Sequence, residues 1–206
     1  MARKHWRKDV IIGAKYWNDR TRYHIQTNNP TEEQLRKEDG KGFLESCGGS
    51  TGANCCAAIG KNTEIVCPGG FILQADEVAT DFFNDPRNYE KLRRLRPGID
   101  PSAIQGNRIP QYYPLMAKEV FGVKAEYFES LTWNKLEQWL ALGSAVQICL
   151  KEPGHFLAVV AKDLVTDEIV FHDSWPARVG GDGFSKRMGK SEFDTNVKNF
   201  CIVYWK

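Results

Sequence analysis

The pattern of apolar and polar positions changes its period close to Gly143. Before this glycine, apolar residues recur every three or four positions, which is typical of amphipathic helices. Thr132 is a suitable N-cap for the clearest of these helices, and Gly143 is a suitable stop; residues 74–83 and 114–122 predict two more. The N-terminal half is therefore predicted to be mainly helix and loop.

Beyond Gly143 the apolar residues alternate or run together, as they do in strands. Residues 146–150 alternate, and residues 155–161 form the mostly apolar run that is typical of a strand buried on both faces. Residues 168–173 return after a turn, and residues 199–205 predict a last strand. The C-terminal half thus predicts an antiparallel sheet, and the chain an α+β fold with a helical half packed on that sheet.

Between the two halves, residues 84–111 are dense in residues that interrupt helices and strands. We predict a long loop region here, with residues 91–96 as the solvated face of a short helix that Pro97-Gly98 ends. Long loops inside a compact domain are more often functional than decorative, so this region is expected to line a binding cleft.

Composition and charge exclude several classes of protein. A chain of 206 residues with 42% hydrophobic residues can bury one substantial core, which predicts a single domain over residues 1–206. The net charge is only +2 and no basic stripe is present, so no nucleic-acid partner is expected. No apolar run is long enough for a signal peptide or a membrane span. We therefore expect synthesis in the cytoplasm without a signal peptide, and no membrane insertion.

Residues 44–60 combine cysteine, glycine and other small side chains. Cys47 precedes two glycines and a run of small residues that could form a short, tightly packed helix, which Gly60 would end. A thiol at a helix N-terminus is stabilised as a thiolate by the helix dipole and becomes a nucleophile. The alternative is that these residues only allow close packing, and this stretch taken alone favours that alternative.

The hairpin of residues 155–173 adds an acid–base pair. If its turn centres near Leu164 or Val165, His155 lies opposite Asp173 at the same end of the two strands, within contact distance. A carboxylate beside an imidazole fixes its tautomer and stabilises its cation. His172 points to the opposite face of its strand and fits that role poorly. With a candidate thiol upstream, the pattern favours thiol nucleophilic catalysis over a surface His–Asp pair.

Four blocks of sequence resemble one family. The Cys-Gly-Gly-Ser-Thr helix start at Cys47, the Gly-His-Phe-Leu-Ala-Val-Val run at His155 and the Val-Phe-His-Asp-Ser-Trp-Pro segment at Asp173 are three of them. They are similar to blocks of papain-like cysteine peptidases of the bacteriocin-leader-processing (double-glycine peptidase-like) type. The Tyr-His-Ile-Gln-Thr-Asn-Asn block around Gln26 is similar to a phage and bacterial branch of that family. Gly49 stands where the family usually has proline.

The resemblance implies a papain-like fold and amide hydrolysis through an acyl-enzyme. Cys47 would be the nucleophile, His155 the acid–base residue and Asp173 the residue that orients it. Gln26 and the Cys47 backbone N–H would stabilise the oxyanion. No metal or organic cofactor is implied, the partner is a peptide substrate, and we expect a monomer.

A second cysteine competes with Cys47. The Asn-Cys-Cys-Ala-Ala block at Cys55 resembles the Ser-Cys-Trp-Ala helix start of papain itself. A helix that began at Cys55 would meet Gly60 after little more than one turn, whereas one from Cys47 has about three turns. Cys47 is therefore preferred.

The expected substrate follows from what the chain lacks. Leader processing does not fit a chain without a signal peptide, a membrane span or an attached transporter. The phage-like block favours a lysin that reaches the cell wall through a separate membrane lesion and cuts peptidoglycan peptides. Three alternatives remain: a peptidase of ordinary proteins, a thiol acyltransferase or transglutaminase-like enzyme with the same triad, and a binding domain that kept only the fold.

Overall fold

A computed structural model describes residues 10–25, 47–61, 64–66, 72–99 and 108–205. Its strands are β1 (Ile11–Gly13), β2 (Glu64–Val66), β3 (Ile72–Gln74), β4 (Ala125–Phe128), β5 (Ala145–Leu150), β6 (Phe156–Asp163), β7 (Glu168–His172), β8 (Lys186–Gly189) and β9 (Val197–Tyr204). Its α-helices are α2 (Cys47–Ala58), α3 (Ala75–Asn84), α4 (Pro86–Leu95), α6 (Tyr113–Phe121), α7 (Trp133–Ala141) and α8 (Lys190–Asn196). Short 3-10 turns are η1 (Arg20–Arg22), η3 (Pro110–Tyr112) and η4 (Pro176–Val179). The expected α+β fold is confirmed.

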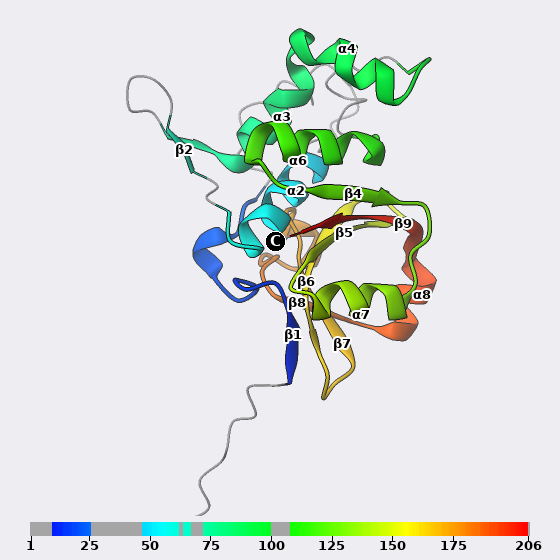
Figure 1. The fold of residues 1–206 in the computed structure, drawn as a ribbon. Coiled ribbons are helices and arrows are strands. Elements are labelled where there is room, and N and C mark those ends of the chain that lie inside the picture. The colour runs from blue at the N-terminus through cyan, green and yellow to red at the C-terminus, as the bar shows by residue number, and fades with distance from the viewer. Residues whose placement is uncertain (1–9, 26–46, 62–63, 67–71, 100–107, 206) are drawn as a thin grey trace, which may run out of the picture.

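Seven of the strands form one antiparallel sheet in the order β4-β9-β5-β6-β7-β8, and β1 pairs with β6 outside this path (Figure 1). The strands β2 and β3 pair with each other in a separate two-stranded sheet. Every residue of β5 and β6 is buried, because helices cover both faces of the sheet there. This double burial is why their sequences are almost continuously apolar.

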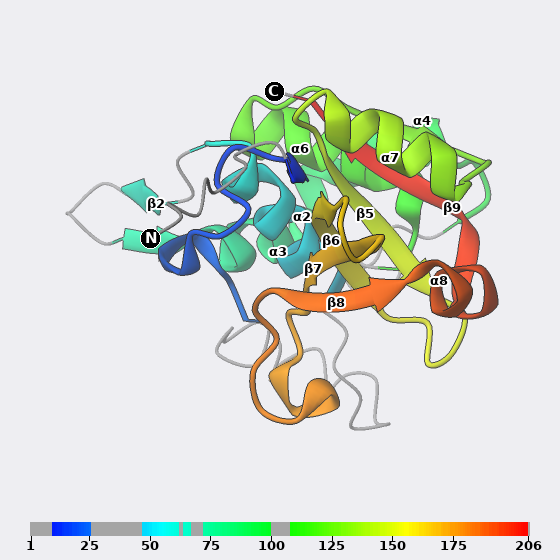
Figure 2. The same ribbon diagram turned by 90° about the horizontal axis from the view of Figure 1, so that it is seen from below.

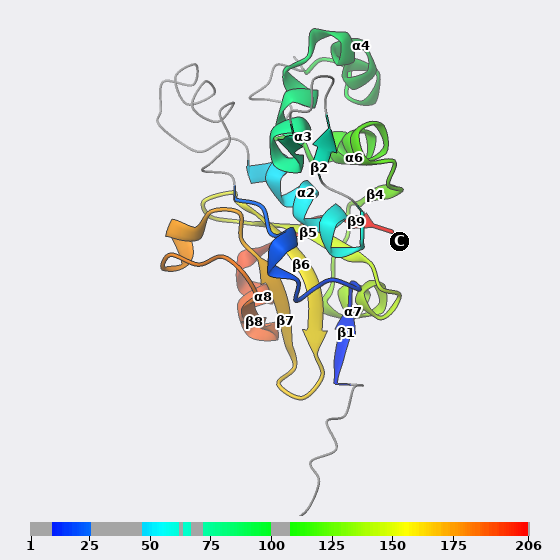
Figure 3. The same ribbon diagram turned by 90° about the vertical axis from the view of Figure 1, so that its left-hand side faces the viewer.

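The sheet separates two hydrophobic cores. Phe156 and Ala158 of β6 belong to the core that contains α2, whereas Leu157 and Val159 belong to the core that contains α7. Successive strand residues point to opposite faces, so one strand supplies both cores. Figures 1 and 3 show α3, α4 and α6 stacked beyond α2, which completes the helical half. A helical half that carries Cys47 against a sheet is the division expected of a papain-like fold.

The predicted helix boundaries agree with the structure where their capping signals were clear. The Thr132 side chain accepts a hydrogen bond from the Lys135 backbone N–H, 3.3 Å away, at the start of α7. Gly122 ends α6 in the left-handed conformation, with φ of 61°. Among the residues described here, no helix has both the length and the apolar character that crossing a bilayer requires.

The long loop predicted over residues 84–111 is wrong in its first part: the short helix expected over residues 91–96 belongs to α4, which already begins at Pro86. Asp85 caps this helix by accepting a hydrogen bond from the Arg87 N–H at 2.9 Å, and Pro86 occupies its first turn. The Asp-Pro pair therefore starts a helix here instead of a loop. The pattern also missed β4, β8 and α8. Figure 2 shows the orange segment after β7 looping out through η4 before it returns as β8.

Candidate active site

Cys47 is the first residue of α2, and its side chain is half-buried. The other residues of the helix are buried. Gly52 allows this close approach, because a Cβ there would lie 2.7 Å from Met116 Cε and 3.0 Å from the Tyr204 hydroxyl oxygen. The small residues of α2 thus let the helix lie directly on the sheet, with Cys47 at its accessible end.

Two buried side-chain hydrogen bonds attach the first half of α2 to the sheet. Gln147 of β5 donates from Nε2 to the Gly48 carbonyl oxygen at 3.1 Å, and its Oε1 accepts from the Tyr204 hydroxyl at 2.5 Å. Thr51 Oγ1 donates to the Phe156 carbonyl oxygen at 3.1 Å. These bonds fix the start of α2 relative to the start of β6.

His155 and Asp173 lie at the same end of the hairpin formed by β6 and β7. His155 directly precedes β6, Asp173 directly follows β7, and His155 Nε2 lies 2.6 Å from Asp173 Oδ1. The predicted contact is therefore present. The Cys47 side chain is close enough to the His155 ring to help raise its pKa, and the Trp175 ring lies edge-on to His155 with centroids 5.9 Å apart. Because Nε2 faces Asp173, Nδ1 is the ring nitrogen left for the thiol.

The charges of this pair reinforce each other. Burial lowers the pKa of His155, but its hydrogen bonds to Asp173 and Cys47 outweigh burial and raise that pKa to about 9. Burial raises the pKa of Asp173, but the hydrogen bond from His155 is the first of several interactions that together bring this pKa below its usual value. Both shifts favour an imidazolium beside a carboxylate at neutral pH.

Sequence reasoning missed Arg178, which binds the other side of Asp173. Arg178 Nε lies 2.7 Å and Nη2 2.6 Å from Asp173 Oδ2. The Trp175 backbone N–H donates to Oδ1 at 2.9 Å. Arg178 lies in η4, a single 3-10 turn that is too short to show a period in the sequence, so spacing gave no signal for this contact.

The backbone of Asp173 is held as firmly as its side chain. Its N–H donates to the Gly183 carbonyl oxygen at 2.8 Å, and its carbonyl oxygen accepts a hydrogen bond from the Tyr23 hydroxyl. A Cβ at Gly183 would overlap both the Asp173 carbonyl and the Tyr23 hydroxyl. Glycine at this position is therefore required by the close approach of two segments that are far apart in sequence.

The other described cysteines suit a nucleophile poorly. Cys55 and Cys56 lie inside α2 with no exposed surface, and burial raises the pKa of both thiols. Burial likewise raises the pKa of Cys149 to about 11 and that of Cys201 to about 12. The five described cysteines are free thiols. Within the same part of the chain, no three His, Cys, Asp or Glu side chains are grouped to hold a metal ion.

His172 has a packing role instead. Its ring stacks on Phe184 with centroids 4.6 Å apart, and Tyr23 lies edge-on to it. His172 Nδ1 accepts a hydrogen bond from the Ser185 N–H at 3.1 Å. Burial lowers the pKa of His172 to about 4, so the ring is neutral at physiological pH. Its separation from the His155 pair agrees with the predicted alternation of faces.

Gln26, the predicted oxyanion donor, lies outside the described residues. The chain shortly before it is attached to α2: the Asn54 side chain accepts from the His24 N–H at 2.8 Å and donates to the His24 carbonyl oxygen at 2.9 Å. Both bonds are buried. The backbone two residues before Gln26 is therefore fixed to the helix that carries Cys47.

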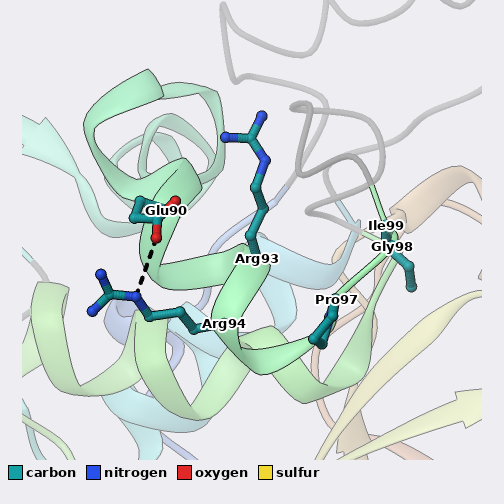
Figure 4. A pocket seen from close by; sticks show the side chains of 6 residues that line it. All are labelled: Glu90, Arg93, Arg94, Pro97, Gly98 and Ile99. Carbon is teal, nitrogen blue, oxygen red and sulfur yellow. Dashed lines mark hydrogen bonds and ion pairs between the residues drawn. The ribbon is translucent and has the colours of Figure 1, made fainter.

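A separate cavity of about 700 Å³ lies at the C-terminal end of α4 (Figure 4). Figure 4 shows Glu90 bonded to Arg94, while Arg93 extends away from that pair. The lining residues are Glu90, Arg93, Arg94, Pro97, Gly98 and Ile99. Neither Cys47 nor His155 is among them, so a cleft-lining role for residues 84–111 stays a prediction.

Comparison with known proteins gave only remote structural likenesses. No protein-family model matches the chain, and no curated protein matches it. The peptidase domain of Streptococcus mutans ComA is 15% identical with a TM-score of 0.38, and the match covers 59% of this chain and 94% of that domain. The peptidase domain of Streptococcus ComA, a bi-functional ABC transporter involved in a quorum sensing pathway, is 13% identical with a TM-score of 0.43. That match covers 80% of this chain and 94% of that domain.

A third solved structure, UfSP from C. elegans, is 10% identical with a TM-score of 0.30. That match covers 62% of this chain and 29% of the other. All three TM-scores are below 0.5, and likeness at this level carries no argument about function. A functional assignment therefore has to come from the geometry of Cys47, His155 and Asp173.

Proposed function

We propose that the protein is a cysteine peptidase in which Cys47, His155 and Asp173 form the catalytic triad. The observation that supports this is the position of His155, whose Nε2 lies 2.6 Å from Asp173 Oδ1 and whose ring is close enough to the Cys47 side chain for the two to interact electrostatically. A thiol beside an imidazole that a carboxylate orients is the general arrangement for thiol nucleophilic catalysis.

The first half of the reaction forms an acyl-enzyme. The Cys47 proton resides on His155, and the thiolate sulfur attacks the carbonyl carbon of the scissile amide, so that a C–S bond forms and the carbonyl oxygen becomes an oxyanion. His155 then gives its proton to the leaving nitrogen as the C–N bond breaks. The products of this half are a thioester on Cys47 and a free amine.

The second half releases the acid. His155 takes a proton from water, and the resulting hydroxide oxygen attacks the thioester carbonyl carbon. The C–S bond breaks, which releases a carboxylic acid and restores the thiolate beside protonated His155. Throughout, Asp173 keeps the ring oriented and stabilises its cation.

The oxyanion would be stabilised at the start of α2. The first N–H groups of a helix have no partner within it, and the helix dipole favours negative charge at that end. The Cys47 backbone N–H is one such group. The Gln26 side chain as a second donor is a prediction from the family resemblance, and the described backbone at His24, two residues earlier, is attached to α2 through Asn54.

For the substrate, we propose peptide bonds of peptidoglycan, the role of a phage-type lysin. The support for this is the similarity of the block around Gln26 to a phage and bacterial branch of the peptidase family. The same triad would serve a peptidase of ordinary proteins, or an acyltransferase if an amine replaced water in the second half.

The nucleophile is tested by alkylation and substitution. Iodoacetamide at about pH 6 should modify Cys47 much faster than the other five cysteines, because an ordinary thiol has a pKa of about 8.5 and is protonated there. Cys47→Ala should abolish hydrolysis, whereas the matched variants Cys55→Ala and Cys56→Ala should keep it. Turnover should fall above about pH 9, because His155 then lacks the proton for the leaving amine. Full turnover by Cys47→Ala would exclude the assignment.

The substrate is tested with purified cell walls from several bacterial types and with an unfolded protein, each analysed by mass spectrometry for new amino termini. New termini on walls would support the lysin proposal. Cleavage of the unfolded protein alone would indicate a peptidase of ordinary proteins. Incorporation of an added amine in place of hydrolysis would indicate an acyltransferase. Slow alkylation of Cys47, together with no turnover of any substrate, would indicate a binding domain.

A further inference from the structure

The carboxylate of Asp173 is bound on both of its oxygens. Oδ1 faces His155 Nε2 at 2.6 Å and accepts from the Trp175 N–H at 2.9 Å. Oδ2 is bound by Arg178 through Nε at 2.7 Å and Nη2 at 2.6 Å. Two neighbouring nitrogens of a planar guanidinium on one oxygen restrict how far the carboxylate can rotate. Arg178 therefore sets which oxygen His155 meets.

Burial makes the charge of Arg178 as important as its shape. The Asp173 side chain has no exposed surface, and a buried carboxylate without a cationic partner is strongly disfavoured. His155 is a cation only while it holds its proton, whereas an arginine remains charged throughout the accessible pH range. Arg178 is thus the permanent counter-charge of Asp173.

Arg178 also connects Asp173 with a second cavity, of about 370 Å³, which lies between η4, β8 and α8. The Arg178 side chain is 24% exposed, so it is accessible where Asp173 is not. The charged residues that line this cavity are Glu152, Arg178, Lys186, Arg187 and Glu192.

We propose that Arg178 is a positioning residue of the triad, which keeps Asp173 ionised and its Oδ1 turned toward His155. This inference rests on the proposed peptidase function. Arg178 acts through Asp173 and is not assigned a contact with the substrate. Its removal should therefore weaken the hold on His155 and, through it, the activation of Cys47.

The pH dependence of that loss follows from the groups around Asp173. The titratable groups that act on it are His155, Arg178 and Tyr23; the Tyr23 hydroxyl binds the Asp173 backbone carbonyl, and the Asp173 charge helps to raise the pKa of Tyr23. Without the guanidinium, the pKa of the buried Asp173 should rise, because the charge of Arg178 is one of the interactions that lower it. Below that higher pKa the carboxyl is neutral and no longer stabilises protonated His155. The acid limb of Cys47 reactivity should therefore move to higher pH.

The experiment compares Arg178→Gln, Arg178→Lys and the control Lys186→Gln, which changes another cation of the same cavity. Rates of Cys47 alkylation by iodoacetamide are measured from about pH 4 to pH 9, and each variant is checked by thermal unfolding. For Arg178→Gln we expect the alkylation rate at the acid end to fall by about tenfold or more, and the acid limb to move to higher pH. Arg178→Lys should keep the limb near the wild-type position with a lower plateau, and Lys186→Gln should match the wild type.

The outcomes separate this inference from the proposed function. A folded Arg178→Gln protein with the wild-type acid limb would overturn the inference and leave the triad standing. If wild-type Cys47 reacts no faster than the other cysteines, the proposed function itself fails. If Arg178→Gln does not fold, Arg178→Lys decides, because a wild-type plateau in that variant would rule out a role for the guanidinium geometry.

Discussion

At the scale of residues, a charged partner decides which of two equally buried histidines is a cation. His155 is 4% exposed and His172 is 3% exposed, yet the pKa of the first is raised to about 9 and that of the second is lowered to about 4. His155 faces a carboxylate, whereas His172 accepts a hydrogen bond from a backbone N–H and is stacked on Phe184. Similar burial thus gives a cation in the site and a neutral ring beside it.

The neutral His172 should make folding stability depend on pH. Its folded pKa of about 4 lies below its unfolded value of about 6.5, so the unfolded chain binds a proton first as the pH falls. Its stabilising effect is therefore complete above about pH 6.5 and is lost progressively down to about pH 4. The loss is of the order of 3 kcal/mol.

Urea unfolding of the wild type and of His172→Gln at a series of pH values measures this effect. The difference between their free energies of unfolding should change across that window and stay constant above it. A difference independent of pH would mean that His172 is not held neutral. The rate of Cys47 alkylation serves as the control. It should be the same in the wild type and in His172→Gln, because His172 lies outside the proposed triad.

The residue contacts of the site were predictable only in part. Strand alternation and the position of the turn were enough to bring His155 and Asp173 together, because a hairpin is a local structure with a fixed register. The hydrogen bond from Arg178 to Asp173 was not predictable. The 3-10 turn η4 is too short to show a period from which the direction of the Arg178 side chain would follow. The placement of Gln26 stays a prediction.

At the scale of elements, α2 illustrates how a helix of low amphipathicity can be predicted by its small residues. Its start at Cys47 and its end before Gly60 were both predicted, and both agree with the structure. What fixes the helix on the sheet comes from elsewhere in the chain: Gln147 on β5 and Tyr204 on β9. Contacts between elements this far apart carry no local signal, so the Gln147–Gly48 and Tyr204–Gln147 hydrogen bonds, which together anchor α2, were not predicted.

The anchor should matter for reactivity separately from stability. Gln147→Leu leaves the buried Tyr204 hydroxyl without its partner, which should cost about 1–3 kcal/mol of unfolding free energy. The double variant Gln147→Leu/Tyr204→Phe removes both polar groups and should recover part of that loss. In both variants iodoacetamide should still alkylate Cys47 more slowly than in the wild type, because the Gly48 carbonyl oxygen at the start of α2 has lost its hydrogen bond from Gln147. A double variant with the wild-type alkylation rate would contradict this role.

At the scale of the whole molecule, the sheet separates a core beneath the site from one that supports the fold. Periodicity predicted that β5 and β6 are buried strands, but it could not predict that the last strand, β9, lies between β4 and β5, because strand order depends on pairing between distant segments. The order matters for the site, since it places Tyr204 of β9 under α2. On the opposite face, α7 packs against β5 and β6 in the second core.

A pair of matched core substitutions tests this division. Met116 of α6 and Leu140 of α7 are both fully buried, the first beside Gly52 of α2 and the second in the core on the other face. Either change to alanine should lower the free energy of unfolding by about 2–5 kcal/mol. Only Met116→Ala should also slow alkylation of Cys47 in the folded protein, because the resulting space lets α2 move relative to His155. Equal alkylation rates in the two variants, measured well below their melting temperatures, would show that the packing beneath α2 does not control the nucleophile.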